Sequence, residues 1–263
     1  MNKPSNLISG VIITFNEEKN IERCINSLLP VVDEVLVVDS FSQDQTVAIA
    51  KKLGAVVIEQ EFLGHIQQKN FAKNKASHQW ILSLDADECL SRELEESILG
   101  IKPIINNYDA YHFNRFTNYC GTWIRHCGWY PDVKLRLFQK HLGAWGGRNP
   151  HDRFIVPDPS RVLHLKGDLL HYSFYKIEEH LSQIEKFAAI GAQAYYEKGI
   201  RANTLNLIIN PAFKFIRNYI LKLGLLDGRA GWRICTLSAY ATYLKYSKLK
   251  NIQKLNRVSI KQN

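Results

Sequence analysis

Three carboxylates stand within four positions, directly after an apolar run. Asp85, Asp87 and Glu88 follow residues 80–84, whose side chains are typical of a buried strand. Crowded carboxylates repel one another and are costly to desolvate, so a compensating charge is needed. Asp85 and Asp87 are two positions apart and share one face of an extended chain. We therefore expect them to hold Mg²⁺ or Mn²⁺, which would also take phosphate oxygens from a substrate.

A simpler structural interpretation of the same residues stays open. Glu88, Glu93, Glu95 and Glu96 would also stabilise the positive end of a helix that begins after the strand. The Asp-x-Asp pattern is short and common, so its place in the chain has to decide between a metal site and a helix terminus.

Strands alternate with helices over the first hundred residues. This alternation predicts an α/β fold, with a mostly parallel sheet that carries helices on both faces. The expected strands are 7–15, 34–39, 55–59 and 80–84, and the expected helices are 21–28, 46–53, 67–77 and 92–99.

Polar side chains gather at the carboxyl ends of three of these strands. Ligands of such sheets bind at that edge, where Thr14, Asn16, Glu17, Asp39 and Asp85 are expected to lie. Asp39 either caps the next helix, for which Asp44 is the better candidate, or accepts hydrogen bonds from a ribose hydroxyl or a base N–H.

The usual phosphate-binding motifs are missing from the sequence. Neither G-x-G-x-x-G nor G-x-x-x-x-G-K-[ST] occurs, so a metal and a cation have to neutralise a bound diphosphate. Lys69, which precedes the Asp-x-Asp strand, is the candidate cation, and a solvated helix face with Lys73 and Lys75 is the alternative.

From residue 109 to about 174 the sequence pattern changes, with strands expected at 111–116 and 133–138 and aromatic, polar loops at 118–132, 145–152 and 171–174. Such loops suit a sugar-binding surface. Asp132 or Asp152 could act as a general base toward an acceptor hydroxyl. His151 or His171 could be a further metal ligand or an acceptor contact, and an ordinary structural role stays open for each.

The basic charge of the chain is confined to its last quarter. Residues 201–263 hold 12 Lys and Arg against one acid, Asp227, whereas residues 1–200 have a net charge of −2. Apolar runs broken by cations follow an amphipathic helix expected at 178–198. Their longest uncharged stretch, 202–213, is too short to span a bilayer. We expect these helices to lie on an anionic membrane surface; packing on the rest of the chain or on a second subunit is the alternative.

The termini and cysteines suggest a cytoplasmic protein. The first residues lack the features of a signal peptide, and the five cysteines are odd in number and form no Cys-x-x-Cys pair. Zinc binding by Cys120, Cys127 and His126 is a weak alternative, because their spacing matches no common zinc pattern.

Three motifs, 12–18, 37–46 and 84–88, agree in order and spacing with one known family. They resemble the GT-A fold glycosyltransferases of family 2 over about the first 100 residues. Residues 125–138 (RHCGWYPDVKLRLF) resemble a narrower group, the lipopolysaccharide inner-core β-1,4-glucosyltransferases of the WaaE/KdtX type. The resemblance implies a metal-dependent inverting hexosyltransferase that uses UDP-glucose and a lipopolysaccharide core acceptor.

The resemblance also implies roles for individual residues. Thr14 and Asp39 would contact the uridine, Lys69 the nucleotide, and Asp85 the ribose or phosphate, while Asp87 would hold Mg²⁺ or Mn²⁺. Asn16 and Glu17 belong to the same donor-binding motif. The expected acceptor contacts are Arg125, Trp129, Arg136 and His151.

Two departures from the family pattern affect these assignments. Asp132 takes the place of the base before Arg136, but Pro131 replaces the usual Glu, so Asp152 remains the alternative base. Phe41 stands where the second motif usually has Gly, which should matter little if that turn has a negative φ.

The expected organisation is a GT-A catalytic region at 1–176 and a basic helical region at 177–263. Residues 1–105 would form the nucleotide-sugar half of the catalytic region and residues 106–176 the acceptor half. The protein would work in the cytoplasm on the inner face of the cell membrane. Two other classes are a haloacid-dehalogenase-like phosphatase, which carries Asp-x-Asp on its first strand, and a non-catalytic membrane or nucleic-acid binder. No nucleic-acid motif is apparent, so no nucleic acid is expected as a partner.

Overall fold

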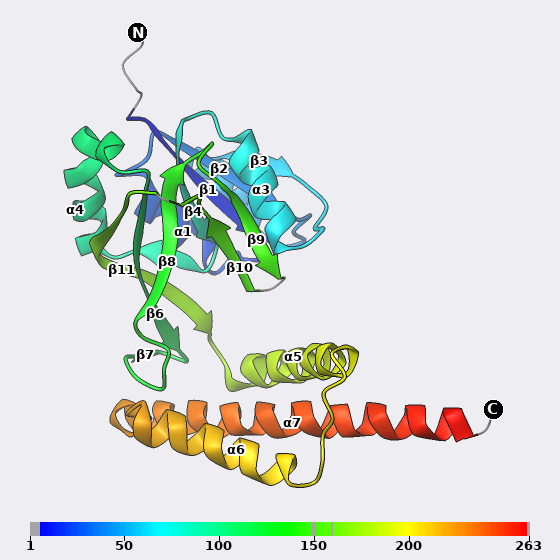
Figure 1. Ribbon diagram of the computed structural model, residues 1–263. Helices are drawn as coiled ribbons and strands as arrows, with labels where there is room; N and C mark the ends of the chain where they lie inside the picture. Colours follow the sequence, from blue (N-terminus) through cyan, green and yellow to red (C-terminus); the bar gives the residue numbers. More distant parts are fainter. Residues whose placement is uncertain (1–5, 149–150, 159, 262–263) are drawn as a thin grey trace. The chain divides into compact units, whose positions relative to one another are not determined.

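The computed structural model describes residues 6–148, 151–158 and 160–261 (Figure 1). The chain forms two compact units. The first takes Met1–Phe116 and Pro131–Tyr172, and the second takes Thr117–Tyr130 and Ser173–Asn263. Two of the three boundaries fall within long strands, β6 (Ala110–Tyr119) and β11 (Val162–Phe174), and the third lies just before Asp132. The expected division into a catalytic region 1–176 and a membrane-associating region 177–263 concerns function and stays a prediction.

The first half of the first unit follows the predicted alternation of strands and helices. Its elements are β1 (Ile8–Thr14), α1 (Ile21–Leu28), β2 (Glu34–Asp39), α2 (Thr46–Lys52), β3 (Val56–Glu59), α3 (His65–Lys75), β4 (Trp80–Asp85), β5 (Glu88–Leu90), α4 (Arg92–Ile101) and the 3₁₀ turn η1 (Lys102–Asn107).

The main sheet has the strand order β3-β2-β1-β4-β8-β6-β11-β5, with β7 paired to β6. Strands β3, β2, β1 and β4 are parallel to one another. The register pairs Thr14 with Asp39 and Ile13 with Asp85, so the three predicted strand ends do meet at one edge.

Alternating side chains of β1 divide the core between the two faces of the sheet. Ile8 and Ile12 pack with α1, α2 and α4 on one face. Val11 and Ile13 pack with α3 on the other face. The α/β fold with helices on both faces is therefore confirmed, and each face is apolar because neighbouring residues of a strand point to opposite sides.

The second half of the sheet is antiparallel, and part of it lies where loops were expected. The further strands are β6 (Ala110–Tyr119), β7 (Thr122–Ile124), β8 (Asp132–Gln139), β9 (Ala144–Arg148), β10 (His151–Ile155) and β11 (Val162–Phe174). Of these, β9 and β10 pair with each other in a separate two-stranded sheet. The loop prediction for 145–152 and 171–174 was wrong: most of these residues lie in the β9–β10 hairpin and in the end of β11. Gly146 and Gly147 weakened the strand pattern there.

The second unit is mainly helical. It contains α5 (Ile177–Glu197), α6 (Asn206–Ile216), the π turn η2 (Arg217–Leu221), the 3₁₀ turn η3 (Gly224–Asp227) and α7 (Gly228–Lys261). Helix α7 packs against both α5 and α6. Tyr119, Ile124 and Cys127 form a small core with Ile234 and Cys235 of α7. Among the described helices, none is both long and apolar enough to cross a membrane.

Candidate functional site

The turns after β1 and β2 are joined by hydrogen bonds. The backbone N–H of Asn16 donates to Ser42 Oγ at 2.8 Å, and its side-chain Oδ1 accepts from the N–H of Gln43 at 2.8 Å. Asn16 has a φ of 54°, a left-handed conformation that Asn tolerates better than most residues. Asn16 therefore holds the two turns of the predicted donor motif together.

Asp39 is fully buried and organises the second turn. Its carboxylate accepts hydrogen bonds from the Ser42 N–H at 2.7 Å and the Ser42 hydroxyl at 2.5 Å. Phe41 between them has a φ of 62° and an exposed ring. A negative φ was the condition under which Phe41 should matter little, and the turn does not meet it. The backbone takes the left-handed conformation that glycine would favour. In Phe41 this conformation is sterically unfavourable, because the residue carries a Cβ.

Thr14 and Glu17 complete this edge of the sheet. The Thr14 hydroxyl is buried and has no partner among the described residues. Burial raises the pKa of Glu17 to about 7; a hydrogen bond from Asn20 opposes this shift, and the charges of Asp87, Asp44 and Asp85 add to it.

Asp85 lies between two cations that come from distant parts of the sequence. Lys69 Nζ of α3 lies 2.9 Å from its Oδ1, and Arg136 Nη2 of β8 lies 3.0 Å from its Oδ2. Burial alone would raise the pKa of Asp85, but the two cations outweigh burial and hold the pKa well below its usual value. Asp85 is therefore a charged carboxylate with its cations already in place.

The charges continue on either side of Asp85. On one side, Lys69 Nζ also binds Asp152 Oδ2 at 2.8 Å. On the other side, Arg136 Nη2 binds Glu88 Oε1 at 2.9 Å. Arg115 then links Glu88, at 3.5 Å, to Asp132, at 2.8 Å. Asp152 and Asp132, the two candidate bases, thus stand at opposite ends of one chain of alternating charges, which we call the ion-pair chain.

Trp145 of β9 lies beside the centre of the ion-pair chain. Lys69 Nζ is 4.7 Å and Arg136 Cζ 5.4 Å from the centroid of its ring. Asn70 fixes the strand, because its side chain donates to Trp145 O at 2.9 Å and accepts from Trp145 N at 3.0 Å. The indole N–H and two guanidinium nitrogens of Arg136 are buried without a described partner. Buried donors without partners are rare and suit a site that receives an anionic ligand.

Asp87 faces a histidine of β11. His171 Nε2 lies 3.1 Å from Asp87 Oδ2, and the N–H of Tyr172 donates to Asp87 O at 2.9 Å. Within the described residues, no group of three or more His, Cys, Asp and Glu side chains fits a metal ion. One carboxylate and one imidazole still fit Mn²⁺ or Mg²⁺ beside a diphosphate, because such ions take their other ligands from water and phosphate. The zinc alternative at Cys120, Cys127 and His126 gains no support.

The predicted acceptor residues lie in different places. Arg136 is buried within the ion-pair chain of the first unit. Arg125 and Trp129 belong to the second unit, where the Arg125 N–H donates to Asp227 Oδ1 at 3.2 Å and Trp129 packs on Tyr119 and His180. His151 begins β10, and its side chain lies outside the described part of the structure.

Sequence reasoning missed the parts played by Arg115, Glu88 and Trp145. The alternation of apolar and basic residues in 133–138 did indicate a strand, whereas Arg136 was named from the family resemblance, as an acceptor contact. Which carboxylates those cations meet depends on strand pairing across the sheet, and no local pattern contains that information.

Comparison with known proteins gives consistent matches. The family model described as Glycosyl transferase family 2 matches residues 9–153. An uncharacterised glycosyltransferase of Rickettsia typhi is 31% identical over 95% of this chain and 89% of its own length. LpsC of Rhizobium meliloti, a lipopolysaccharide core biosynthesis glycosyltransferase, is 28% identical over 89% of this chain and 85% of its own length. The crystal structure of S. aureus TarS 1–349 is 17% identical, covers 96% of this chain and 92% of that chain, and gives a TM-score of 0.47.

Proposed function

The chain belongs to the glycosyltransferases of family 2, and from this premise we propose that it transfers glucose from UDP-glucose to a lipopolysaccharide core acceptor with inversion at the anomeric carbon. Its fold is the GT-A fold expected from the resemblance. The observation that carries the proposal is the set of groups at the ends of β1, β2 and β4, where buried unpaired donors of Arg136 and Trp145 lie beside Asp85.

The donor would bind along this edge. Asp39 would accept from the uracil or ribose, since its carboxylate is already fixed by Ser42 and keeps lone pairs for a ligand. Thr14 offers a buried hydroxyl without a described partner. Asn16 would affect donor binding indirectly, because it joins the two turns. Glu17 lies close enough to Asp87 for the charge of Asp87 to raise the pKa of Glu17.

The metal proposal rests on Asp87 and His171. These two side chains would hold Mg²⁺ or Mn²⁺, and the imidazole ligand favours Mn²⁺ because Mg²⁺ prefers oxygen ligands. When bound, the ion would supply positive charge to the departing diphosphate. Asp85 was also expected to bind the metal, but Lys69 and Arg136 already engage its oxygens, so we propose a positioning role for it instead.

We assign the general base to Asp152 rather than to Asp132. Asp132 is held by Arg115 at 2.8 Å and Lys134 at 3.0 Å, so both of its oxygens are engaged. Asp152 binds Lys69 through Oδ2 alone among the described contacts, and its side chain is only 10% exposed. It is also next to the Lys69–Asp85 pair, where the donor would bind. Asp132 remains the alternative that the resemblance suggested.

The reaction would then be a single displacement. The base takes the proton of an acceptor hydroxyl, and that oxygen forms a bond to the anomeric carbon from the face opposite the nucleotide. The bond from the anomeric carbon to the diphosphate breaks, and its electron pair leaves with UDP. Lys69 and Arg136 contribute fixed positive charge beside the leaving group, which lowers the barrier because no solvent has to reorganise.

The proposed acceptor rests on likeness to LpsC and on the resemblance of residues 125–138. Arg125, Trp129 and His151 remain the proposed acceptor contacts. Arg136 is better placed to position Asp85, since it is buried between Asp85 and Glu88. The proposed place of work is the cytoplasmic face of the cell membrane, on an anionic lipid surface.

Calorimetric titration of UDP and UDP-glucose, with and without Mn²⁺, tests the donor site. The wild type should bind both ligands more tightly with Mn²⁺, and Asp87→Asn should lose the metal-dependent part while its unfolding curve is unchanged. Glu93→Gln, on the exposed side of α4, is the matched control and should behave like the wild type. Absence of UDP binding by the folded wild type would overturn the proposal.

A further inference from the structure

Helix α6 is apolar, yet none of its residues is buried. Its large apolar side chains recur three or four positions apart and continue into η2, so they form one stripe along the helix. They are 48% to 65% exposed: Leu205, Ile208, Ile209, Phe213, Ile216 and Ile220. A helix in water normally buries such a stripe, and an exposed one marks an interaction site.

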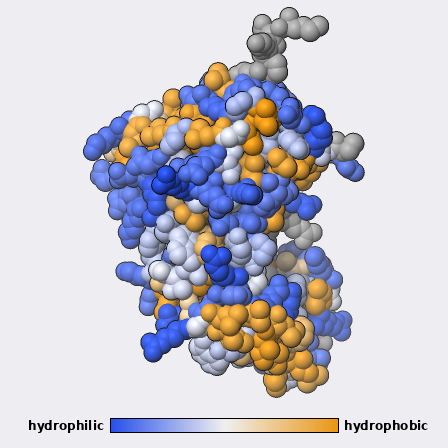
Figure 2. Space-filling view, turned by 90° about the vertical axis from the view of Figure 1, so that its left-hand side faces the viewer, coloured by the Kyte–Doolittle hydropathy of each residue, from blue (hydrophilic) through white to orange (hydrophobic). Residues whose placement is uncertain are grey.

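The chain that links α6 to α7 continues this exposed surface. Leu221, Leu223, Leu225 and Leu226 are 45% to 69% exposed, and Trp232 near the start of α7 is 54% exposed. Figure 2 shows hydrophobic side chains gathered over the helical unit, in the lower part of the view. We call the exposed apolar residues of 205–232 the apolar surface.

Cations surround the apolar surface without matching acids. Lys214, Arg217, Lys222, Arg229 and Arg233 form no ion pair in the part of the chain that the structure describes. Burial lowers the pKa of Lys214, and the nearby charges of Arg217 and Lys222 lower it further. The positive charge of this surface is therefore not neutralised within the unit.

The one acid of residues 201–263 cannot neutralise them. Asp227 is 6% exposed in its side chain, and its carboxylate accepts from the backbone and ring of His126 at 2.8 and 2.9 Å. These hydrogen bonds fix residues 117–130 to η3, so the carboxylate of Asp227 does not pair with the cations of the apolar surface.

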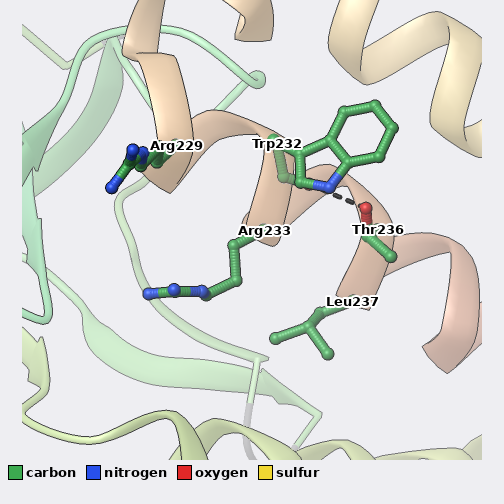
Figure 3. Close-up of a pocket in the computed structure, with 5 residues that line it drawn as sticks. All are labelled: Arg229, Trp232, Arg233, Thr236 and Leu237. Atoms are coloured by element: carbon green, nitrogen blue, oxygen red, sulfur yellow. Dashed lines mark hydrogen bonds between the residues drawn. The ribbon is translucent and has the colours of Figure 1, made fainter.

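Two of the cations line a hollow on helix α7. Arg229, Trp232, Arg233, Thr236 and Leu237 lie on one face of the helix and line a space of about 360 Å³. Figure 3 shows the side chains of Arg229 and Arg233 extending from successive turns toward the same side. Two guanidinium groups one turn apart suit a phosphate group, while the Thr236 hydroxyl beside them already donates to Trp232 O at 2.9 Å.

Charge decides which partner fits the apolar surface. A second copy of the chain would bring the same positive patch against itself, because a two-fold interface pairs a surface with its own copy. A nucleic acid would satisfy the cations but offers no apolar partner for exposed leucines and isoleucines. An anionic bilayer satisfies both, since it presents phosphates at its surface and acyl chains just below.

We propose that the apolar surface docks on an anionic lipid bilayer, with α6 and the 221–226 segment entering the headgroup boundary and Arg229 and Arg233 binding a lipid phosphate. This deepens the proposed function, on which it rests for the lipid-linked acceptor, by assigning the surface and its headgroup site. Trp232 would lie at the interface, where indole rings are favoured. The docking is peripheral, because no described helix is able to cross the membrane.

Vesicle co-sedimentation of the full chain tests the proposal. The wild type should bind vesicles with about one-third phosphatidylglycerol and release at high salt, but should not bind pure phosphatidylcholine. The double variant Arg229→Glu/Arg233→Glu should bind at least tenfold more weakly, since each basic residue near such a surface contributes about fivefold to binding. The charge-matched control Lys51→Glu/Lys52→Glu changes exposed lysines of α2 and should bind like the wild type.

A second pair of variants tests the apolar part. Ile208→Ser/Leu221→Ser should weaken binding to the same vesicles at least tenfold, whereas Ile104→Ser, at an exposed site of the first unit, should not. Equal losses of vesicle binding in Arg229→Glu/Arg233→Glu and in its control would overturn the proposal. So would a wild-type dimer that Ile208→Ser/Leu221→Ser dissociates. Preference of the wild type for duplex DNA over vesicles would overturn it as well.

The vesicle-binding experiment and the UDP titration are independent of each other. Vesicle binding needs no nucleotide, and UDP titration needs no vesicle. Wild type that binds UDP but not anionic vesicles would overturn the docking surface alone, and wild type that binds vesicles but not UDP would overturn the proposed function alone.

Discussion

Asp85 shows how this site holds a carboxylate charged in a buried place. Its burial would favour the protonated acid, yet Lys69 and Arg136 lie within 3.0 Å and keep it ionised. Glu88 supports the arrangement by accepting the Asp85 N–H at 3.0 Å and by binding Arg136. The result is a rigid set of charges beside the strand end, which is the kind of preorganisation that stabilises a departing anion.

The choice between the two candidate bases can be tested by a matched pair of variants. Asp152→Asn should lower the transfer rate about 10²- to 10⁴-fold, the usual contribution of a general base. Asp132→Asn should retain activity within about tenfold, because Asp132 is engaged by Arg115 and Lys134. Initial rates with a lipopolysaccharide core acceptor measure this. The opposite ranking, with UDP affinity unchanged in both variants, would return the role to Asp132.

Glu17 should make the stability of the protein depend on pH. Its pKa of about 7 in the folded chain exceeds the model-peptide value of 4.5, so the folded state binds the proton more tightly. This contribution to stability is present below about pH 4.5 and is lost as the pH rises to about 7. Glu17→Gln should remove this loss of stability, so the variant should melt about 2–4 °C higher than the wild type at pH 8.

Melting curves of wild type and Glu17→Gln at pH 5, 6, 7 and 8 measure this difference. The exposed Glu22→Gln is the control and should follow the wild-type curve. A Glu17→Gln variant that loses stability between pH 5 and 8 as steeply as the wild type would contradict the assignment.

At the scale of single residues, sequence reasoning found the carboxylates but not all of their partners. Asp85, Asp87 and Lys69 could be named because they stand at strand and helix positions that the pattern reveals. Arg136 is 51 residues from Asp85, and Arg115 meets Asp132 through pairing of β6 with β8. Phe41 shows a second limit, because a left-handed φ occupied by an aromatic residue breaks the rule by which such positions are recognised.

At the scale of elements, local pattern was sufficient for the parallel half of the sheet. Strand β2 and helix α1 have the predicted bounds, and β1, β3 and β4 differ by one or two residues. These strands are continuous apolar runs because helices cover both faces. Strand β11 of the antiparallel half is partly exposed and carries a weaker pattern, as do β9 and β10 of the separate two-stranded sheet, where β9 contains two glycines.

The junction of β11 with α4 depends on a glycine. Gly167 has a φ of +87°, and a Cβ there would lie 2.3 Å from Leu94 N and 2.7 Å from Leu94 Cα. Gly167→Ala should lower the free energy of unfolding by about 2–5 kcal/mol, from left-handed strain and from overlap with the helix backbone. Urea denaturation measures the change.

Gly54→Ala is the matched control for this prediction. Gly54 has a φ of +83°, but nothing lies within 4 Å of an added Cβ, so only the left-handed strain of about 1–2 kcal/mol should appear. Equal losses of unfolding free energy in the two variants would show that the close approach of β11 to α4 does not contribute to the effect of Gly167→Ala.

At the scale of the whole molecule, composition indicated a separate basic region but not the boundaries of the units. The +11 charge of residues 201–263 coincides with helices α6 and α7, and the family model matches residues 9–153. The haloacid-dehalogenase alternative is wrong, since the chain belongs to another family and carries Asp-x-Asp after β4. Composition could not reveal that residues 117–130 leave the first unit and join the helices, because that depends on which distant residues they pack against.

This packing predicts the behaviour of a fragment that ends at residue 176. In the full chain Tyr119 and Ile124 are at most 1% exposed, and Ile234 and Cys235 of α7 belong to the same core. The fragment lacks α7, so these side chains would meet water at a cost of about 1.5–3 kcal/mol each. We expect it to bind a hydrophobic dye strongly and to associate, whereas the full chain should do neither through this core.

Dye fluorescence and light scattering on the purified fragment measure this outcome. Ile124→Ser within the fragment should reduce dye binding, because it removes apolar surface that no longer has a partner, while in the full chain the same change should lower the melting temperature instead. A fragment that stays monomeric, binds no dye and melts cooperatively would show that residues 117–130 can be covered without α7. In that case the catalytic region would end at 176 as a physical unit, as the sequence led us to expect.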